Sequence, residues 1–205
     1  MYQEIIDLLF HPGIFFERRN KEKISLVIPA IIIGIGGVVN FLSPLAERAI
    51  IDGGDLSHFV VMPLAVVFFL VLPFVLWFVV AGILTVFSWF FSGTGSFSAM
   101  LQNCGYGYLP QTLLSPLVII NGIALASWSP STSSAIPTGV IIVVGIIPIL
   151  SIFWSGWLWS VAMEKTHALS RGRAMAGAAL VVLLYLSPLI LNIIADIHAN
   201  GYPAR

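Results

Sequence analysis

Residues 93–110 read GTGSFSAMLQNCGYGYLP and join two long apolar segments of the chain. The stretch carries no charge, yet it is too polar and glycine-rich to cross a bilayer as one uninterrupted apolar helix. Ser96 is placed to cap a helix, because a serine hydroxyl accepts a hydrogen bond from a free backbone N–H. Apolar side chains then recur at helical spacing, at Phe97, Met100, Leu101, Cys104 and Tyr108. The stretch therefore predicts a short interfacial helix that turns into the next membrane span, either lying on the membrane surface or dipping into it.

The glycines in this stretch allow a second interpretation, which the surrounding residues exclude. Gly93 and Gly95 could belong to a phosphate-binding loop, but no strand precedes them and no lysine follows. Gly105 and Gly107 allow the backbone to bend or to pack closely against a neighbour. We therefore expect a structural turn here, and no nucleotide site.

Composition indicates what surrounds the chain. Of its 205 residues, 59% are hydrophobic and only 9% are charged, whereas soluble domains carry about 25% charged residues. The mean hydropathy is +1.01, so most of the surface must face lipid. The net charge is zero, which argues against a nucleic-acid partner. A single cysteine, Cys104, excludes an internal disulfide framework. We expect no cleavable signal peptide, because the first apolar run is long enough to stay in the membrane.

The apolar runs predict an all-α fold, a polytopic membrane helix bundle with five transmembrane helices and short amphipathic interfacial helices. Residues 1–23 form an N-terminal amphipathic segment, residues 24–198 the membrane domain and residues 199–205 a short tail. The spans are expected at 24–45, 59–91, 106–126, 136–163 and 174–197.

Basic residues predict the orientation of these spans. Two segments share the positive charge, with Arg18, Arg19, Lys21 and Lys23 in the first and Lys165, Arg171 and Arg173 in the second. The opposite side holds only Arg48 and Arg205. Because basic loops stay in the cytoplasm, we expect a cytoplasmic N-terminus and an external C-terminus, in the cytoplasmic membrane of a prokaryote. The first basic cluster suits contact with anionic lipid or docking of a protein partner.

Catalytic and metal-binding patterns are not found in the sequence. No Asp, Glu, Lys or Arg lies between Asp55 and Glu164, although pumps and coupled transporters usually keep such residues at depth. The four histidines lack the i, i+3 or i+4 partners of a helical metal site. Ser155-Gly156 resembles a rhomboid serine motif, but no base lies within reach in a later span. We therefore expect no enzymatic activity, no cofactor and no metal site.

Four short motifs resemble the Yip domain family, named for membrane proteins that interact with Ypt/Rab GTPases. The first is His11-Pro12 with Phe15-Phe16, and the second is the glycine-rich stretch at 93–97. Gly105-Tyr106 with Leu109-Pro110 and the stretch at 167–170 follow in the family's order. The resemblance implies a five-span helical fold with a cytoplasmic N-terminus. In eukaryotes it implies a role in vesicle traffic through partner binding, without catalysis.

The chain differs from eukaryotic members of that family in its N-terminal region. It lacks their long cytosolic N-terminal region and their Asp-Leu-Tyr-Gly-Pro stretch, and it resembles a bare prokaryotic version. A Rab-type GTPase is therefore not the expected partner. Membrane lipids, another membrane protein or a second copy of the chain are expected instead.

Together these features predict a non-enzymatic membrane protein that acts by partner or lipid interaction. We expect the interface to involve Phe15, Phe16, Arg18, Arg19, Gly95, Gly105, Tyr106 and Pro110. The first four belong to the point where the chain meets the membrane, and the others to the central turn. The proline- and glycine-broken, uncharged spans leave two alternatives open, a passive pore and a membrane subunit of a transporter or larger complex.

Overall fold

A computed structural model describes residues 2–51, 62–126 and 146–201 of the chain. Within these ranges the chain is helical and has no strand, which confirms the predicted all-α class. Parts of the second and fourth predicted spans and the end of the tail lie outside the described residues. The described helices are α1 (Tyr2–Phe10), α2 (Pro12–Arg19), α3 (Val27–Ile51), α4 (Met62–Phe90), α5 (Phe97–Tyr106), α6 (Leu109–Ala126), α8 (Ile147–His167) and α9 (Arg171–Gly201).

The long helices α3, α4, α6, α8 and α9 lie where the five spans were predicted. Several boundaries differ from the prediction. α3 ends at Ile51 and α8 at His167, beyond the predicted ends at 45 and 163. α6 begins at Leu109, because Gly107 and Tyr108 form a turn after α5. Among the described residues, Leu70–Phe90 in α4 is long and apolar enough to cross a membrane, and Val27–Leu42 in α3 is a shorter apolar helix.

The surface of α4 is apolar and largely uncovered by the rest of the protein. Only 28% of the most apolar window of Leu70–Phe90 is buried. Val71, Phe78 and Val79 are each about half exposed, at 50%, 49% and 48%. A core helix of a soluble protein would hide such side chains, and contiguous apolar surface of this kind marks contact with a partner or a membrane.

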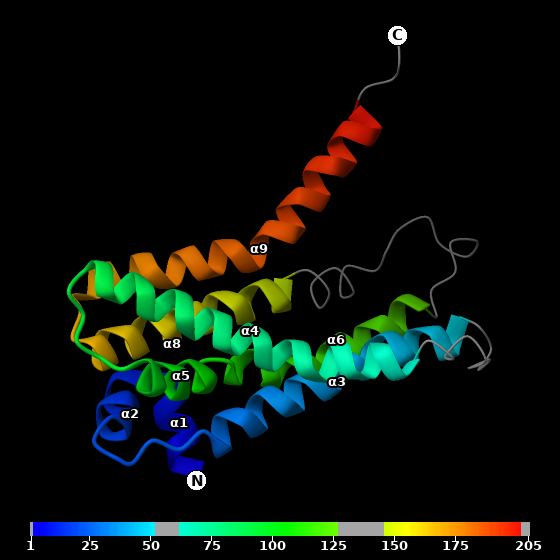
Figure 1. Ribbon diagram of the computed structural model, residues 1–205. Coiled ribbons are helices and arrows are strands. Elements are labelled where there is room, and N and C mark those ends of the chain that lie inside the picture. Colours follow the sequence, from blue (N-terminus) through cyan, green and yellow to red (C-terminus); the bar gives the residue numbers. More distant parts are fainter. Residues whose placement is uncertain (1, 52–61, 127–145, 202–205) are drawn as a thin grey trace.

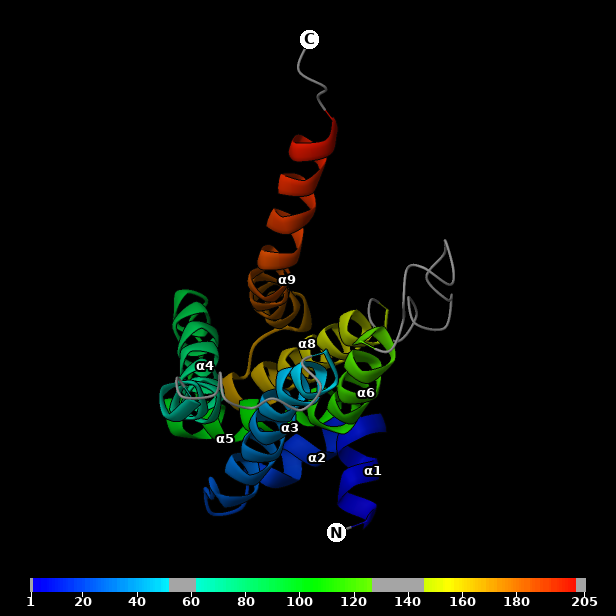
Figure 2. The same ribbon diagram turned by 90° about the vertical axis from the view of Figure 1, so that its right-hand side faces the viewer.

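The helices form a bundle with α1 and α2 at one end (Figure 1). In the end-on view, α4 and α6 lie on opposite sides, with α3 and α8 between them (Figure 2). The short helix α5 lies beneath α4 and α8, near α2 (Figure 1). The α4–α5 connection and the α8–α9 turn lie at the same end of the bundle as α2, so three connections far apart in sequence share one end (Figure 1).

Proline residues inside two of the long helices are accommodated by the serines that precede them. Pro116 and Pro188 have no N–H to donate to the carbonyls four residues earlier. The hydroxyl of Ser115 instead donates to the carbonyl of Thr112 at 2.8 Å, and Ser187 donates to Leu184 at 2.8 Å. The same tetrapeptide, Leu-Ser-Pro-Leu, occurs at equal intervals at 42–45, 114–117 and 186–189, in three of the long helices.

Helix α9 bends part-way along, and its C-terminal half leaves the bundle (Figure 1). A proline inside a helix is a common cause of such a bend, and Pro188 lies inside α9. The first half of α9 packs closely on α8, where small residues leave room for it. A side chain at Gly156 would meet Val182, and one at Gly177 would meet Met163 and Phe87.

The N-terminal segment forms two helices separated at His11. Proline is favoured at the first position of a helix, since its missing N–H is not needed there, and Pro12 begins α2. Proline and the residue before it disfavour a continuing helix, and α1 does end at Phe10. A second helix, which the sequence did not predict, begins at Pro12, and the N–H groups of Ile14 and Phe15 both donate to the carbonyl of His11.

Candidate interface at the loop end of the bundle

Helix α5 lies at the centre of the end where the connections meet. As predicted, Ser96 caps it, and its hydroxyl accepts a hydrogen bond from the N–H of Ala99 at 3.2 Å. Phe97 and Ser98 in its first turn are exposed, but every residue from 101 to 110 is buried, so the polar side chains of Gln102 and Asn103 are covered by protein. The structure therefore differs from the expected interfacial helix, whose polar face would meet water or headgroups.

Two tryptophans from neighbouring helices bind carbonyls of α5. The indole N–H of Trp77 in α4 donates to the carbonyl of Leu101 at 2.8 Å, and that of Trp159 in α8 donates to Cys104 at 3.1 Å. Carbonyls in the last turn of a helix lack intrahelical partners, so the bond to Cys104 satisfies one that would otherwise be orphaned. A tryptophan near the end of an apolar run is typical of an aromatic belt at the membrane interface, whereas the structure buries Trp159 completely.

The side-chain amides of α5 fix two other segments. Asn103 donates from Nδ2 to Oδ1 of Asn20 at 2.7 Å and to Oγ1 of Thr166 at 2.8 Å. Oε1 of Gln102 accepts a hydrogen bond from the N–H of Ser25 at 2.5 Å. Asn103 thus joins the end of α2 to the end of α8, while Gln102 holds the last part of the connection to α3, just before that helix begins.

The connection from α4 to α5 packs against the last residues of α8. The N–H of Thr94 donates to the carbonyl of His167 at 3.2 Å. At Gly95 there is no room for a side chain, because a Cβ there would lie 2.2 Å from the carbonyl oxygen of Thr166. This glycine is required for close approach between two backbones, which is a structural role.

His167 is buried at this contact, and neither ring nitrogen has a hydrogen-bond partner among the described residues. Burial lowers the pKa of His167, because desolvation disfavours the charged imidazolium. The ring is therefore held in its neutral form against the backbone of the α4–α5 connection.

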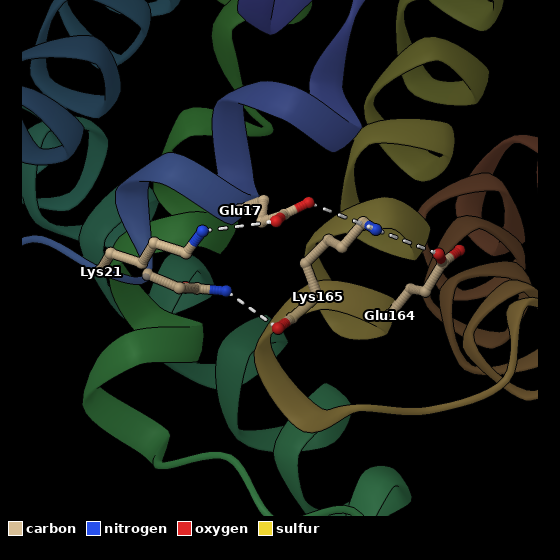
Figure 3. Close-up of polar contacts among 5 residues, drawn as sticks. Glu17, Lys21, Glu164 and Lys165 are labelled. Carbon is tan, nitrogen blue, oxygen red and sulfur yellow. Dashed lines mark hydrogen bonds and ion pairs between the residues drawn. The ribbon is translucent and has the colours of Figure 1, made fainter.

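Charged side chains surround this end. Oε1 of Glu17 pairs with Lys21 at 3.4 Å, and Oε2 of Glu17 lies 4.0 Å from Nζ of Lys165 (Figure 3). Lys165 lies between Glu17 and Glu164, and its backbone carbonyl accepts from Nδ2 of Asn20 at 2.9 Å (Figure 3). Exposed ion pairs contribute only about 0–1 kcal/mol each, so they indicate proximity more than stability. The two basic segments of the sequence are therefore neighbours in space.

The structure brings four of the predicted interface residues into one cluster around Tyr106. The Phe15 ring lies 5.0 Å from that of Tyr106, edge to face, and 5.3 Å from that of Phe16. The Arg19 guanidinium lies 5.3 Å from the Tyr106 ring centre on a cation–π contact. Phe15 and Phe16 are 5% and 0% exposed, so they face the interior rather than the membrane.

The remaining predicted interface residues are distributed around the same end. Arg18 is exposed and pairs with Asp7 of α1 at 3.3 Å. A Cβ at Gly105 would lie 2.5 Å from Cβ of Pro29 and 3.0 Å from the Trp77 ring, so this glycine permits α3 and α4 to approach α5. Pro110 is buried in the first turn of α6. Within α1 and α2, the most exposed large apolar side chains are instead Phe10 and Ile14, both 62% exposed.

Several residues that build this end were not found from the sequence. Asn20, Asn103 and Thr166 are polar residues without a motif, and only folding brings them together. Trp77 and Trp159 look like ordinary membrane-interface tryptophans in sequence. Local signals existed only for the close approaches, at Gly95 and Gly105, and both glycines were among the predicted residues.

In the described part of the chain, no group of three or more His, Cys, Asp or Glu side chains is placed to hold a metal ion. Cys104 is a free thiol buried in α5, and burial raises its pKa well above the ordinary value.

The arrangement of this end is suited to fixing the relative positions of α2, α5 and α8, and to presenting the outer faces of α1 and α2.

Comparisons with known proteins identify relatives of the chain. An uncharacterized protein of the archaeon Methanocaldococcus jannaschii is 30% identical over 111 residues, which cover 52% of this chain and 79% of that protein. No solved structure matches the chain. The family model of the Yip1 domain matches residues 6–191, from α1 through the bend region of α9. The chain therefore belongs to the Yip1 domain family, and it is a membrane protein of that family.

Proposed function

We propose that the chain is a five-span, non-enzymatic membrane protein that binds a protein partner or lipid at the end formed by α1, α2, α5 and the α8–α9 turn. The observation that carries this proposal is the mixed outer surface of α1 and α2. Phe10 and Ile14 are each 62% exposed there, beside the exposed cations Arg18 and Lys21. Large apolar side chains next to basic ones are typical of a surface that enters the headgroup region or docks a membrane partner.

The arrangement of the long helices supports five spans. A bilayer core needs about 20 helical residues, and α3, α4, α8 and α9 have 25, 29, 21 and 31, while α6 has 18. The helix α8 is less apolar than α4 because it carries three serines and its last turn includes Glu164, Lys165 and His167. Four spans between the N-terminal segment and the α8–α9 turn would put both on one side of the membrane. The contact between Glu17 and Lys165 supports that topology, because it places the two segments next to each other.

The cytoplasmic side is the proposed location of this end. Seven of the nine Lys and Arg residues belong to the two segments that meet there, and the positive-inside rule places such segments in the cytoplasm. In this topology the C-terminus lies on the outer side. The proposed membrane is the cytoplasmic membrane of a prokaryotic cell. The partner is a membrane protein, lipid or a second copy of the chain.

The proposal predicts that Phe10→Ser with Ile14→Ser reduces partner or lipid binding. Native mass spectrometry of the protein, extracted mildly from its own membrane, is the measurement. We expect the wild type to retain a stoichiometric partner or lipid. We expect the double variant to lose most of it, because two exposed apolar side chains contribute about 1.5–3 kcal/mol each when fully buried.

The matched control is Phe10→Leu with Ile14→Leu, which keeps the surface apolar and should retain binding. A stoichiometric protein in the wild-type spectrum would identify an adaptor or subunit role, and lipid alone would identify a role in lipid organisation. Equal retention by the serine and leucine variants would refute the proposed surface. Solute flux through liposomes containing the pure protein would instead favour the passive pore.

A further inference from the structure

A cavity of about 360 Å³ lies between α3, α4, α6, α8 and α9, apart from the end described above. Its size falls in the range of about 300–1,000 Å³ that is usual for small-molecule sites. Two prolines line it, Pro73 of α4 and Pro148 of α8, together with Gly36 and Gly37 of α3. Small and helix-distorting residues therefore leave space at the place where the five long helices meet.

The wall of the cavity has no charged side chain. Asp, Glu, Lys, Arg and His are all absent from its lining residues, most of which are apolar. An ion would meet no opposite charge there, and burying one without a partner is costly. A ligand of this cavity is therefore uncharged in the part that enters it.

Most of the hydroxyl groups in the wall already bond to neighbouring backbone. Thr112 donates to the carbonyl of Ile32 at 3.1 Å, and Ser115 donates to that of Thr112 at 2.8 Å. Ser151 donates to the carbonyl of Pro148 at 2.7 Å. These groups are satisfied without a ligand.

Two donors in the wall remain available. Nε2 of Gln111 is buried and has no hydrogen-bond partner among the described residues. The hydroxyls of Tyr108 and Tyr185 lie 2.6 Å apart, so one proton bridges them and the other is left to donate. A buried amide without a partner costs about 1–3 kcal/mol, so a ligand that supplies an acceptor would be stabilised there.

We propose that this cavity binds an uncharged lipid that carries a carbonyl oxygen, which accepts hydrogen bonds from Gln111 and the Tyr108–Tyr185 pair. The apolar wall holds the hydrocarbon part of the ligand. Both a diacylglycerol, with ester carbonyls, and an isoprenoid quinone, with ring carbonyls, have this chemistry.

The cavity also has a route to lipid. Leu76 of α4 lines it and is 39% exposed, and Asn40 of α3 lines it from an exposed position. Both belong to helices with apolar outer surfaces. A hydrophobic ligand can therefore enter from the side of the bundle without crossing water.

The test is native mass spectrometry of delipidated protein in detergent, titrated separately with dioleoylglycerol, a menaquinone and phosphatidylglycerol. We expect one-to-one binding of at least one uncharged probe and weaker binding of the anionic one. Gln111→Met, which keeps the length of the side chain and removes the donor, should weaken that binding about fivefold. Its melting temperature should stay equal or rise, because the unpartnered amide is gone.

Ser151→Leu supplies a second, steric variant, since the larger side chain fills the cavity. It should abolish binding, and if it does not fold, Gln111→Met decides alone. Binding of dioleoylglycerol alone would identify an ester lipid, and binding of the menaquinone alone would identify a quinone. The proposal is overturned if neither uncharged probe binds one to one, if Gln111→Met binds as tightly as wild type, or if phosphatidylglycerol binds equally well. Because Phe10 and Ile14 do not line this cavity, failure here leaves the proposed interface untouched.

Discussion

Gly95→Ala is expected to lower the free energy of unfolding by about 3 kcal/mol or more. The new Cβ would lie 2.2 Å from the carbonyl oxygen of Thr166 and 2.8 Å from Nδ1 of His167. Overpacking by a methylene usually costs about 1–3 kcal/mol when side chains can move, and here the obstacle is backbone. The melting temperature in detergent should fall by about 10 °C, given about 2–4 °C per kcal/mol for a chain of this size.

The control for this variant is Gly172→Ala in the first turn of α9. A Cβ at Gly172 has nothing within 4 Å, so alanine should be neutral or slightly stabilising there. Equal melting temperatures for the two variants would show that the α4–α5 connection does not press against the end of α8.

Acidification is expected to destabilise the protein through His167. Its pKa in the folded protein is lowered by burial, from an ordinary value of 6.5. The unfolded chain therefore binds the proton first as the pH falls, and the folded state loses stability. The stabilisation that depends on neutral His167 is complete above pH 6.5. It is lost as the pH falls from 6.5 toward the pKa that His167 has in the folded protein. Each pKa unit by which burial lowers the pKa of His167 corresponds to about 1.4 kcal/mol of folding free energy lost on protonation.

Thermal unfolding of wild type and His167→Gln between pH 8 and pH 5 measures this effect. Glutamine does not titrate, so the difference in melting temperature between the two proteins isolates the histidine from Glu164 and the other charged groups nearby. The wild type should lose more stability than the variant below pH 6.5. A constant difference across the range would mean that His167 is not buried in its neutral form.

The parts of the fold that were predictable are those with a local cause. Helical spacing and the capping serine correctly predicted α5 and its start at Ser96. Pro12, Gly156 and Gly177 act equally locally, since α1 ends before the proline and the two glycines leave room for α8 and α9 to pack closely. In each case the residues that decide the structure lie within a few positions of one another.

The candidate site depended on partners distant in sequence, and it was predicted less well. Gln102 and Asn103 are polar, so water or headgroups were the expected surroundings, yet Asn103 bonds to Asn20 and Thr166. Phe15 was expected to face the membrane, but the ring of Tyr106 lies against it inside the protein. Amphipathic patterns distinguish apolar from polar faces, but they do not distinguish lipid from a neighbouring helix as the cover of an apolar face.

The central claim is that the N-terminal segment and the α8–α9 turn lie on the same side of a membrane, opposite the C-terminus. Three variants, Lys23→Cys, Arg171→Cys and Ala204→Cys, test it when labelled with a membrane-impermeant maleimide. They would be made in a Cys104→Ala background, which keeps the backbone carbonyl that accepts from Trp159. In intact cells we expect label only at position 204, and in inverted vesicles only at positions 23 and 171. Label at 23 and 171 from opposite sides, or at 204 from the same side as 23, would contradict the account.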